Sequence, residues 1–149
     1  MREAFVSIGS NINASTNMEL VKDHLNVFKK VTYSSVYKSS AEGFVGEDFL
    51  NCVCKFQSAE NPHELRQILK SIEKDMGRDI SQKGMSNRVI DLDLILLGDL
   101  VIHDGEIDIP STDIEKYKFV LEPLAEIAPD TLHPTQKKSF KNLLVSIFG

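Results

Sequence analysis

The sequence lacks the features that would place the protein in a membrane or outside the cell. The apolar run at residues 4–8 is shorter than the core of a secretory signal, and no cleavage site follows it. No apolar stretch is long enough to span a bilayer. Cys52 and Cys54 are the only cysteines, and none of the four histidines is spaced to complete a zinc site with them. These absences predict a reduced cytoplasmic protein whose two cysteines are small buried hydrophobic residues.

Basic residues are also too few for general binding to nucleic acid or to an anionic membrane. The chain has 17 basic and 22 acidic residues, which gives a formal net charge of -5. Neither of the two common nucleotide-binding glycine motifs, G-x-x-x-x-G-K-[ST] and G-x-G-x-x-G, is present. Any phosphate site must therefore be local, and any nucleotide must be bound without these motifs.

The 149 residues fit a single domain, 1–149, which would bury about two-thirds of its unfolded surface. Apolar alternation and turn residues predict strands at 4–8, 31–37, 50–56 and 88–97, with the turn Gly9-Ser-Asn11 closing the first. A capping box at Thr16 and Glu19 predicts the start of a first helix. A second helix is predicted from Asn61 as N-cap and Pro62 to a C-terminal cap at Gly77.

This order of strand, helix, strand, strand, helix, strand is typical of an α+β ferredoxin-like sandwich. In that arrangement both helices cover one face of an antiparallel sheet, and the other face is left for function. Apolar residues at helical spacing predict two more helices as C-terminal additions, at 119–128 and 139–148. The polar connections 39–48 and 78–87 are longer than typical loops and could act as lids that exclude water from a phosphate donor, or could be surface loops only.

Two aspartates in an apolar strand are the most informative feature of the chain. Asp91 and Asp93 are two residues apart, so in a strand they project from the same face. The opposite face would carry Leu92, Leu94 and Leu96. Paired carboxylates suit Mg²⁺, which binds one or two of them and completes its shell with waters and substrate phosphates. With Arg88 three residues earlier, the segment predicts a metal and phosphate site; the alternative is a pair of aspartates that face solvent at a strand end.

The third predicted strand places an aromatic ring and an amide on one face. Phe49 and Asn51 project from the face opposite Cys52 and Cys54. Base stacking on an aromatic side chain contributes about 1 to 3 kcal/mol per ring in nucleic-acid complexes, and an asparagine amide both donates and accepts hydrogen bonds. The pair is therefore suited to a flat heterocycle with a hydrogen-bonding edge, although an exposed aromatic and a solvated amide would give the same pattern.

Several motifs together resemble the hydroxymethyl-dihydropterin pyrophosphokinases of folate biosynthesis, over nearly the whole chain. They are Gly9-Ser-Asn11, Phe49-Leu-Asn51, Gly77-Arg78, Arg88-x-x-Asp91-Leu-Asp93 and Phe119-x-Leu-x-Pro-Leu-x-Glu-Ile-Ala-Pro129. The resemblance implies transfer of the β,γ-pyrophosphate of ATP to the hydroxymethyl oxygen of the pterin, which leaves AMP. It implies two Mg²⁺ ions as cofactors and small-molecule substrates only, with no nucleic-acid or membrane partner and a monomer as the default state.

The resemblance also implies roles on the phosphate side of the site. Asp91 and Asp93 would hold both ions between the ATP phosphates, with Asp91 near the attacking hydroxyl. Arg88 would contact the phosphates, and Arg78 would act during transfer or release. Glu73 would lie near the nucleotide. Arg78 could instead complement the dipole of the helix before it, and Glu73 could be a solvated helix charge.

On the substrate side, the resemblance implies a site for the pterin ring. The ring would lie between Phe49 and Phe119, with the amide of Asn51 bonded to its edge. Backbone groups around Ser39 and Glu42 would close that edge.

The departures from the family pattern concentrate on the nucleotide side. Ile80 and Met85 stand where the family usually has an arginine and a tryptophan, Tyr117 replaces another expected arginine, and Ser40 replaces a proline. The remaining nucleotide contacts would fall to a set of polar residues, namely Lys83, Thr112, Lys116 and Lys118. A lysine is a point charge without the bidentate fork of arginine. We expect weaker ATP binding than in relatives with the full arginine set, and an equal ATP affinity would refute this.

Two other hypotheses remain open from the sequence. A related protein could bind pterin or a similar ring without efficient transfer, and AMP production would separate it from an active enzyme. An RNA-binding module could have the same order of elements, but it would need basic and aromatic residues where this chain has Asp91 and Asp93.

Overall fold

The computed structural model describes residues 1–41, 45–78 and 88–149. The strands within this part of the chain are β1 (Arg2–Ser10), β2 (Lys29–Tyr33), β3 (Tyr37–Ser39), β4 (Phe49–Ser58), β5 (Asp91–Leu97), β6 (Ile102–His103) and β7 (Asp108–Ile109). The helices are α1 (Ala14–Leu25), α2 (Pro62–Asp75), α3 (Asp113–Lys116), α4 (Lys118–Ile127) and α5 (Phe140–Phe148). None of these helices has the length and apolar character needed to cross a bilayer.

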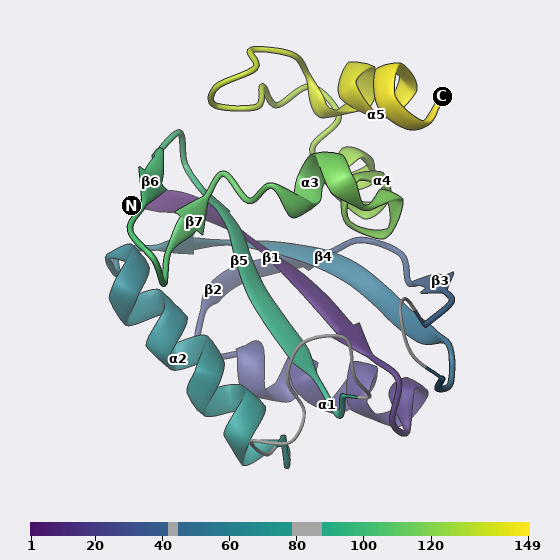
Figure 1. Ribbon diagram of the computed structural model, residues 1–149. Coiled ribbons are helices and arrows are strands. Elements are labelled where there is room, and N and C mark those ends of the chain that lie inside the picture. The colour runs from purple at the N-terminus through teal and green to yellow at the C-terminus, as the bar shows by residue number, and fades with distance from the viewer. Residues whose placement is uncertain (42–44, 79–87) are drawn as a thin grey trace.

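The main sheet has the strand order β2-β4-β1-β5, and β3 pairs with the other end of β4. All of these pairings are antiparallel. Helices α1 and α2 lie on one face of the sheet, whereas α3, α4 and α5 lie on the other (Figure 1). The predicted α+β ferredoxin-like arrangement, with an antiparallel sheet and C-terminal additions, is confirmed.

The second helix begins and ends as its sequence predicts. The Asn61 side chain accepts from the backbone N–H of Glu64, and the Glu64 side chain accepts from the backbone N–H of Asn61. At the other end Gly77 has φ of 100°, a left-handed conformation that favours glycine, and its N–H bonds the carbonyl of Lys74. Local interactions therefore fix both ends of α2.

Three local predictions were wrong. Helix α1 begins at Ala14 after Asn13, so Thr16 lies inside the helix and the capping box that we predicted there does not form. The second predicted strand is interrupted after Tyr33, where a buried Ser34 bonds the backbone of β4 through its own N–H and hydroxyl. Strand β1 also continues through Gly9 to Ser10, so the expected turn begins two residues later.

The alternation of β5 is broken by a β-bulge. Phe5 pairs with Leu96 and Val6 pairs with Leu94, which leaves Ile95 as an extra residue in β5. As a result Leu96 packs with Phe5 against the C-terminal helices, on the face of the aspartates. The prediction that Leu96 faces away from them was wrong, whereas Leu92 and Leu94 do pack on the side of α1 and α2.

The C-terminal helices cover only part of the second face. Their apolar side chains pack on a group of sheet residues that comprises Phe5, Val53, Ile95 and Leu96. The end of the sheet that carries Gly9, Asn51 and Asp91 lies outside this cluster. The fold therefore leaves one end of this face available for a site.

Candidate active site

Three neighbouring strands place Asn51, Gly9 and Asp91 in one row across the sheet. Gly9 on β1 pairs with Asn51 on β4 and with Asp91 on β5. Directly opposed residues project from the same face of a sheet, so the amide and the carboxylate lie on either side of a residue without a side chain. A Cβ at Gly9 would lie 3.3 Å from Asn51 Oδ1 and 3.7 Å from Phe49 Cδ1. The floor of the site therefore has no side chain between its amide end and its acidic end.

The acidic end is surrounded by paired charges. Asp91 Oδ1 lies 2.8 Å from Arg78 Nη1, and its Oδ2 lies 3.0 Å from Arg88 Nη1. Burial acts to raise the pKa of Asp91, but a hydrogen bond from Asp93 and the positive charges of the two arginines hold it below its ordinary value. Asp91 is therefore the ionised member of the aspartate pair.

Asp93 has the opposite electrostatic character. It projects from the same face as Asp91, opposite Ser7 on β1. Burial, the adjacent negative charge of Asp91 and the hydrogen bond that Asp93 donates to it all raise the pKa of Asp93 well above its ordinary value. In the ligand-free protein Asp93 thus keeps the proton that it shares with Asp91 to a higher pH than an ordinary carboxyl group would, and a cation between the two groups would favour release of that proton.

We expect Asp93→Asn to stabilise the ligand-free protein at neutral pH. A carboxyl group whose pKa is raised in the folded state contributes stability below its unfolded pKa, and this contribution is lost as the pH rises through the folded pKa. Asparagine keeps a donor toward Asp91 without the charge. Thermal unfolding with a chelator at pH 7.5 should show a melting temperature higher by a few degrees, roughly what 1 kcal/mol gives in a protein of this size.

The gain should shrink toward pH 4, because this carboxyl group then begins to be protonated in the unfolded wild type as well. Asp99→Asn, an exposed change just after the same strand, is the control and should have little effect at either pH. A gain of equal size at both pH values would contradict the assignment of the shared proton to Asp93.

A buried glutamate on α2 binds two sides of this charge cluster. Glu73 is 3% exposed, and its Oε2 accepts from the backbone N–H of Leu92 at 2.7 Å and pairs with Arg78 Nη1 at 2.8 Å. Its other oxygen pairs with Lys70 at 3.2 Å. The N–H of Arg78 in turn bonds the carbonyl of Glu73, which completes the helix cap begun by Gly77. Glu73 thereby fixes both Arg78 and the strand that carries the aspartates.

The Gly-Ser-Asn segment holds the chain that precedes β5. The hydroxyl of Ser10 donates to the carbonyl of Val89 at 2.6 Å. Asn11 accepts from the N–H of Arg88 through its side chain and donates to the carbonyl of Arg88 through its backbone. Ser10 and Asn11 were not predicted as site residues, yet they determine where Arg88 lies.

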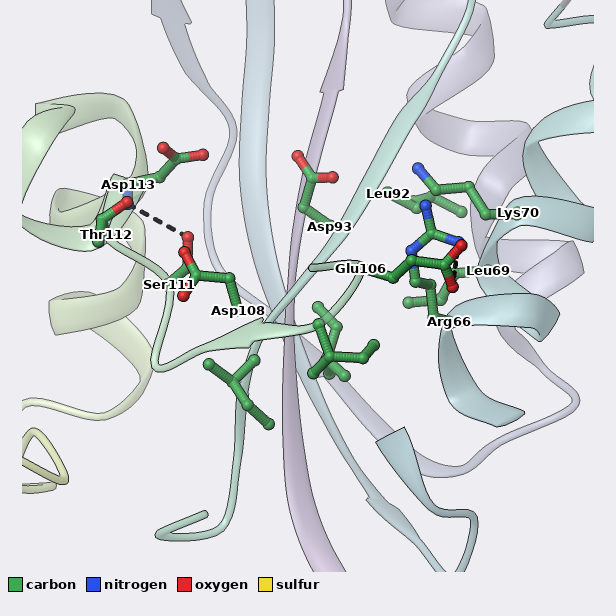
Figure 2. A pocket seen from close by; sticks show the side chains of 13 residues that line it. Arg66, Leu69, Lys70, Leu92, Asp93, Glu106, Asp108, Ser111, Thr112 and Asp113 are labelled. Carbon is green, nitrogen blue, oxygen red and sulfur yellow. Dashed lines mark hydrogen bonds and ion pairs between the residues drawn. The ribbon is translucent and has the colours of Figure 1, made fainter. Parts of the chain in front are cut away.

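A cavity of about 280 Å³ adjoins Asp93. Figure 2 shows Asp93 near its centre, with Arg66 and Lys70 of α2 on one side and Thr112 and Asp113 on the other. The β6-β7 hairpin forms another wall with residues 106–109. The cationic side chains of Arg66 and Lys70 thus line one cavity with Asp93, together with the carboxylates of Glu106, Asp108 and Asp113.

The other end of the row is built for hydrogen bonding. Asn51 is buried, and its Nδ2 donates to Ser39 Oγ at 2.8 Å and more weakly to the carbonyl of Tyr37 at 3.4 Å. Its Oδ1 faces Gly9. Phe119, at the start of α4, stacks on Tyr117 with ring centroids 4.8 Å apart.

The structure brings most of the predicted residues to one end of the sheet. Arg78, Arg88, Asp91 and Glu73 form one charge cluster, and Thr112 lines the adjoining cavity. Lys118 is exposed at the start of α4 and does not line that cavity, and Lys116 is exposed on α3. Glu42 and Lys83 fall outside the described residues, as do most of the predicted lid at 78–87 and the centre of the lid at 39–48.

Sequence reasoning missed the wall formed by α2 and the hairpin. Arg66, Lys70 and Glu73 are spaced i, i+4 and i+7 on α2, so helical periodicity alone places them on one face. That signal could have added Arg66 and Lys70 to the prediction. The β6-β7 hairpin gave no such signal, because strands of two residues are too short to show alternation.

Comparison with known proteins identifies the family. Residues 5–129 match the family described as 7,8-dihydro-6-hydroxymethylpterin-pyrophosphokinase (HPPK). The chain belongs to this family. Among HPPK relatives, the 2-amino-4-hydroxy-6-hydroxymethyldihydropteridine pyrophosphokinase of Aquifex aeolicus is 33% identical over 147 residues, which cover 95% of this chain and 89% of that protein. The pyrophosphokinase of the same name from Haemophilus influenzae is 32% identical, with 92% and 88% covered.

The chain is also similar to part of a longer protein. The folic acid synthesis protein FOL1 of Dictyostelium discoideum is 34% identical over 139 residues, which cover 88% of this chain but 20% of that protein. The chain therefore spans nearly all of the two bacterial relatives and about a fifth of the Dictyostelium protein.

Proposed function

We propose that the protein transfers pyrophosphate from ATP to the hydroxyl of 6-hydroxymethyl-7,8-dihydropterin, giving AMP and the pterin diphosphate in folate biosynthesis. Membership of the HPPK family and the names of the bacterial relatives support this activity. The observation that carries the proposal is the row in which Asn51 and Asp91 lie on either side of Gly9. Across two strand spacings of about 4.8 Å each, the row is long enough for a pterin ring at one end and its hydroxymethyl group near the aspartates.

Asp91 and Asp93 would hold two Mg²⁺ ions. The fit rests on their shared face, on the burial and the adjacent charge of Asp91 that raise the pKa of Asp93, and on their all-oxygen chemistry. When bound, the ions would neutralise the phosphate charge and align the attacking and leaving oxygens. Without them the carboxylates would repel a polyphosphate.

Arg78 and Arg88 would guide the phosphates. Both side chains are more than four-fifths buried and already oriented by Asp91. Arg78 is held from its other side by Glu73, so neither arginine needs to be ordered when the substrate binds. Binding of a cation at Asp91 would weaken its pairing with the arginines and leave their donors for phosphate oxygens.

The cavity next to Asp93 is the candidate site for the nucleotide. Thr112 and Lys70 on its walls offer a hydroxyl and an ammonium group, and Arg66 supplies a guanidinium that the sequence prediction did not include. Glu73, Lys83 and Lys118 remain predicted nucleotide contacts. Arg66 would supply part of the positive charge that the missing family arginines would have provided at other positions. We still expect weak ATP binding.

The pterin would bind at the amide end of the row. Asn51 Oδ1 lies beside Gly9 and would accept a hydrogen bond from the ring, while Phe49 and Phe119 would stack on its faces. Ser39 would act on the ring edge directly or through its hydrogen bond to Asn51, and Glu42 remains a predicted contact.

A catalytically weakened pterin-binding homologue is the second candidate function, because the changes at Ile80, Met85 and Tyr117 affect the nucleotide side alone. The protein should be incubated with Mg²⁺, ATP and the hydroxymethyl-dihydropterin, and AMP should be measured by chromatography. Stoichiometric AMP and pterin diphosphate are expected. Pterin binding without AMP would favour the weakened homologue.

We further propose that the protein acts as a monomer in the cytoplasm. Cys52 and Cys54 are free and buried, which supports a reducing compartment. Sedimentation velocity would test the monomer.

A further inference from the structure

A carboxylate on the last turn of α4 is bonded to the connection between β2 and β3. Glu126 Oε2 accepts from the backbone N–H of Ser35 at 2.9 Å and from its hydroxyl at 3.0 Å. The other oxygen, Oε1, accepts from the hydroxyl of Tyr37 at 2.6 Å. Desolvation acts to raise the pKa of Glu126, but the hydrogen bonds from Tyr37 and Ser35 hold it below its ordinary value. Glu126 therefore stays ionised at neutral pH and keeps three charge-assisted hydrogen bonds.

The strand that Glu126 holds is the one that orients Asn51. Strand β3 has only three residues, and it pairs Tyr37 with Asn51 and Ser39 with Phe49. The amide of Asn51 donates to Ser39 Oγ and to the carbonyl of Tyr37. A strand of three residues has few backbone hydrogen bonds to define its position. The hydrogen bonds to Glu126 therefore contribute a large part of what holds β3 in place.

The helix that carries Glu126 also carries the proposed ring partner Phe119. The two residues are seven positions apart on α4, which places them on the same face of the helix. Phe119 lies at the start of α4, and Glu126 lies two turns later, where it bonds the β2-β3 connection. A single carboxylate thus links the helix with Phe119 to the strand that orients Asn51.

We propose that Glu126 is a positioning residue for the pterin end of the site, which sets the spacing between Phe119 and the Asn51 amide without touching the substrate. This inference rests on the proposed function, because it concerns the same ring site. It also gives a physical role to the glutamate of the Glu-Ile-Ala-Pro segment, which the sequence singled out without assigning it one.

The test is a set of variants assayed for both substrates. Glu126→Ala should raise the KM for 6-hydroxymethyl-7,8-dihydropterin about tenfold, since it removes charge-assisted hydrogen bonds at a partly solvated site. The KM for ATP should stay within about twofold, because the cavity is lined by other elements. Glu126→Gln keeps an acceptor oxygen and should fall between wild type and Glu126→Ala.

The hydrogen bond between Glu126 and Tyr37 can also be removed by changing Tyr37, which is a milder substitution. Tyr37→Phe removes one hydroxyl and should raise the pterin KM about threefold. In the Glu126→Ala background the same change should have no further effect, because the bond it removes is already absent.

Glu122→Gln is the matched control. Glu122 lies one turn earlier on α4, and its charge also acts on Tyr37, but the hydrogen bonds from Ser35 and Tyr37 go to Glu126 instead. Glu122→Gln should change neither KM. A pterin KM raised as much as in Glu126→Ala would mean that loss of negative charge alone explains the effect, and this would overturn the inference. An equal rise in both KM values, or no change in either, would also overturn it.

Calorimetric titration with the same pterin tests the role of Glu126 independently of the proposed pyrophosphate transfer. If wild-type protein makes no AMP, the proposed function fails, and pterin affinities of the variants still decide the role of Glu126. If Glu126→Ala unfolds below the assay temperature, Tyr37→Phe and Glu126→Gln decide it alone.

Discussion

Replacing Asp91 or Asp93 by alanine is expected to reduce AMP formation by about a thousandfold, the scale of several kcal/mol of charge stabilisation at a metal-assisted phosphoryl transfer. The two variants should differ in stability. Asp91→Ala leaves Arg78 and Arg88 without their shared partner in a mostly buried site, whereas Asp93→Ala relieves repulsion. The measurement is AMP formed at saturating ATP and pterin, with folding checked by circular dichroism.

Asp91→Asn and Asp93→Asn keep the shape of each side chain and should be as inactive as the alanine variants if charge is what matters. Asp99→Asn should retain wild-type activity, since Asp99 lies exposed beyond the far end of β5. If folded aspartate variants keep more than about a tenth of the wild-type AMP formation, the metal-site assignment is wrong, because loss of a required metal ligand should reduce the rate much further.

Gly9→Val is expected to abolish pterin binding while the protein stays folded. Even a single Cβ at Gly9 would lie 3.3 Å from Asn51 Oδ1, so the two methyl groups of valine would occupy the space between the amide and the aspartates that the pterin is proposed to use. Valine is favoured in strands, which should preserve β1. We expect the pterin affinity to fall at least about a hundredfold, a loss of about 2.7 kcal/mol, and Gly9→Ala to give an intermediate loss.

Calorimetric titration of pterin into each variant checks this expectation, with ATP affinity measured alongside. Glu3→Val is the matched control, because Glu3 lies on the same strand and the same face, about 20 Å from Gly9 at 3.4 Å per residue. Wild-type pterin affinity in folded Gly9→Val would mean that the ring binds elsewhere.

The sequence predicted best where local interactions decide the structure. The ends of α2 follow from Asn61, Glu64 and Gly77, each acting within a few residues of itself. Asp91 and Asp93 share a face because strand alternation acts over two residues. The same logic failed at Leu96, since the β-bulge at Ile95 is a property of the pairing with β1 and leaves no mark in the alternation of β5.

The charge cluster shows the limit of the prediction more clearly. Glu73, Arg78 and Asp91 were each predicted as site residues, but their mutual contacts join a helix, its cap and a strand. The spacing of two residues in the sequence predicts a contact only when both lie in one regular helix or strand. These residues lie in different elements, so their contacts could not be predicted. The link from Glu126 to Tyr37 spans 89 positions and was not predicted for the same reason.

By itself, the sequence determined the order of the main strands and helices, most of the apolar faces that pack, and the residue types suited to a metal, a phosphate and a flat ring. Periodicity, capping and turn chemistry act over a few residues, so a linear pattern contains them. Only the tertiary structure decided that Asn51 and Asp91 face each other across Gly9, that Glu73 and Asn11 hold the arginines, and that the C-terminal helices leave this end of the sheet uncovered. These features depend on strand register and on the packing of distant segments, which form only when the whole chain folds.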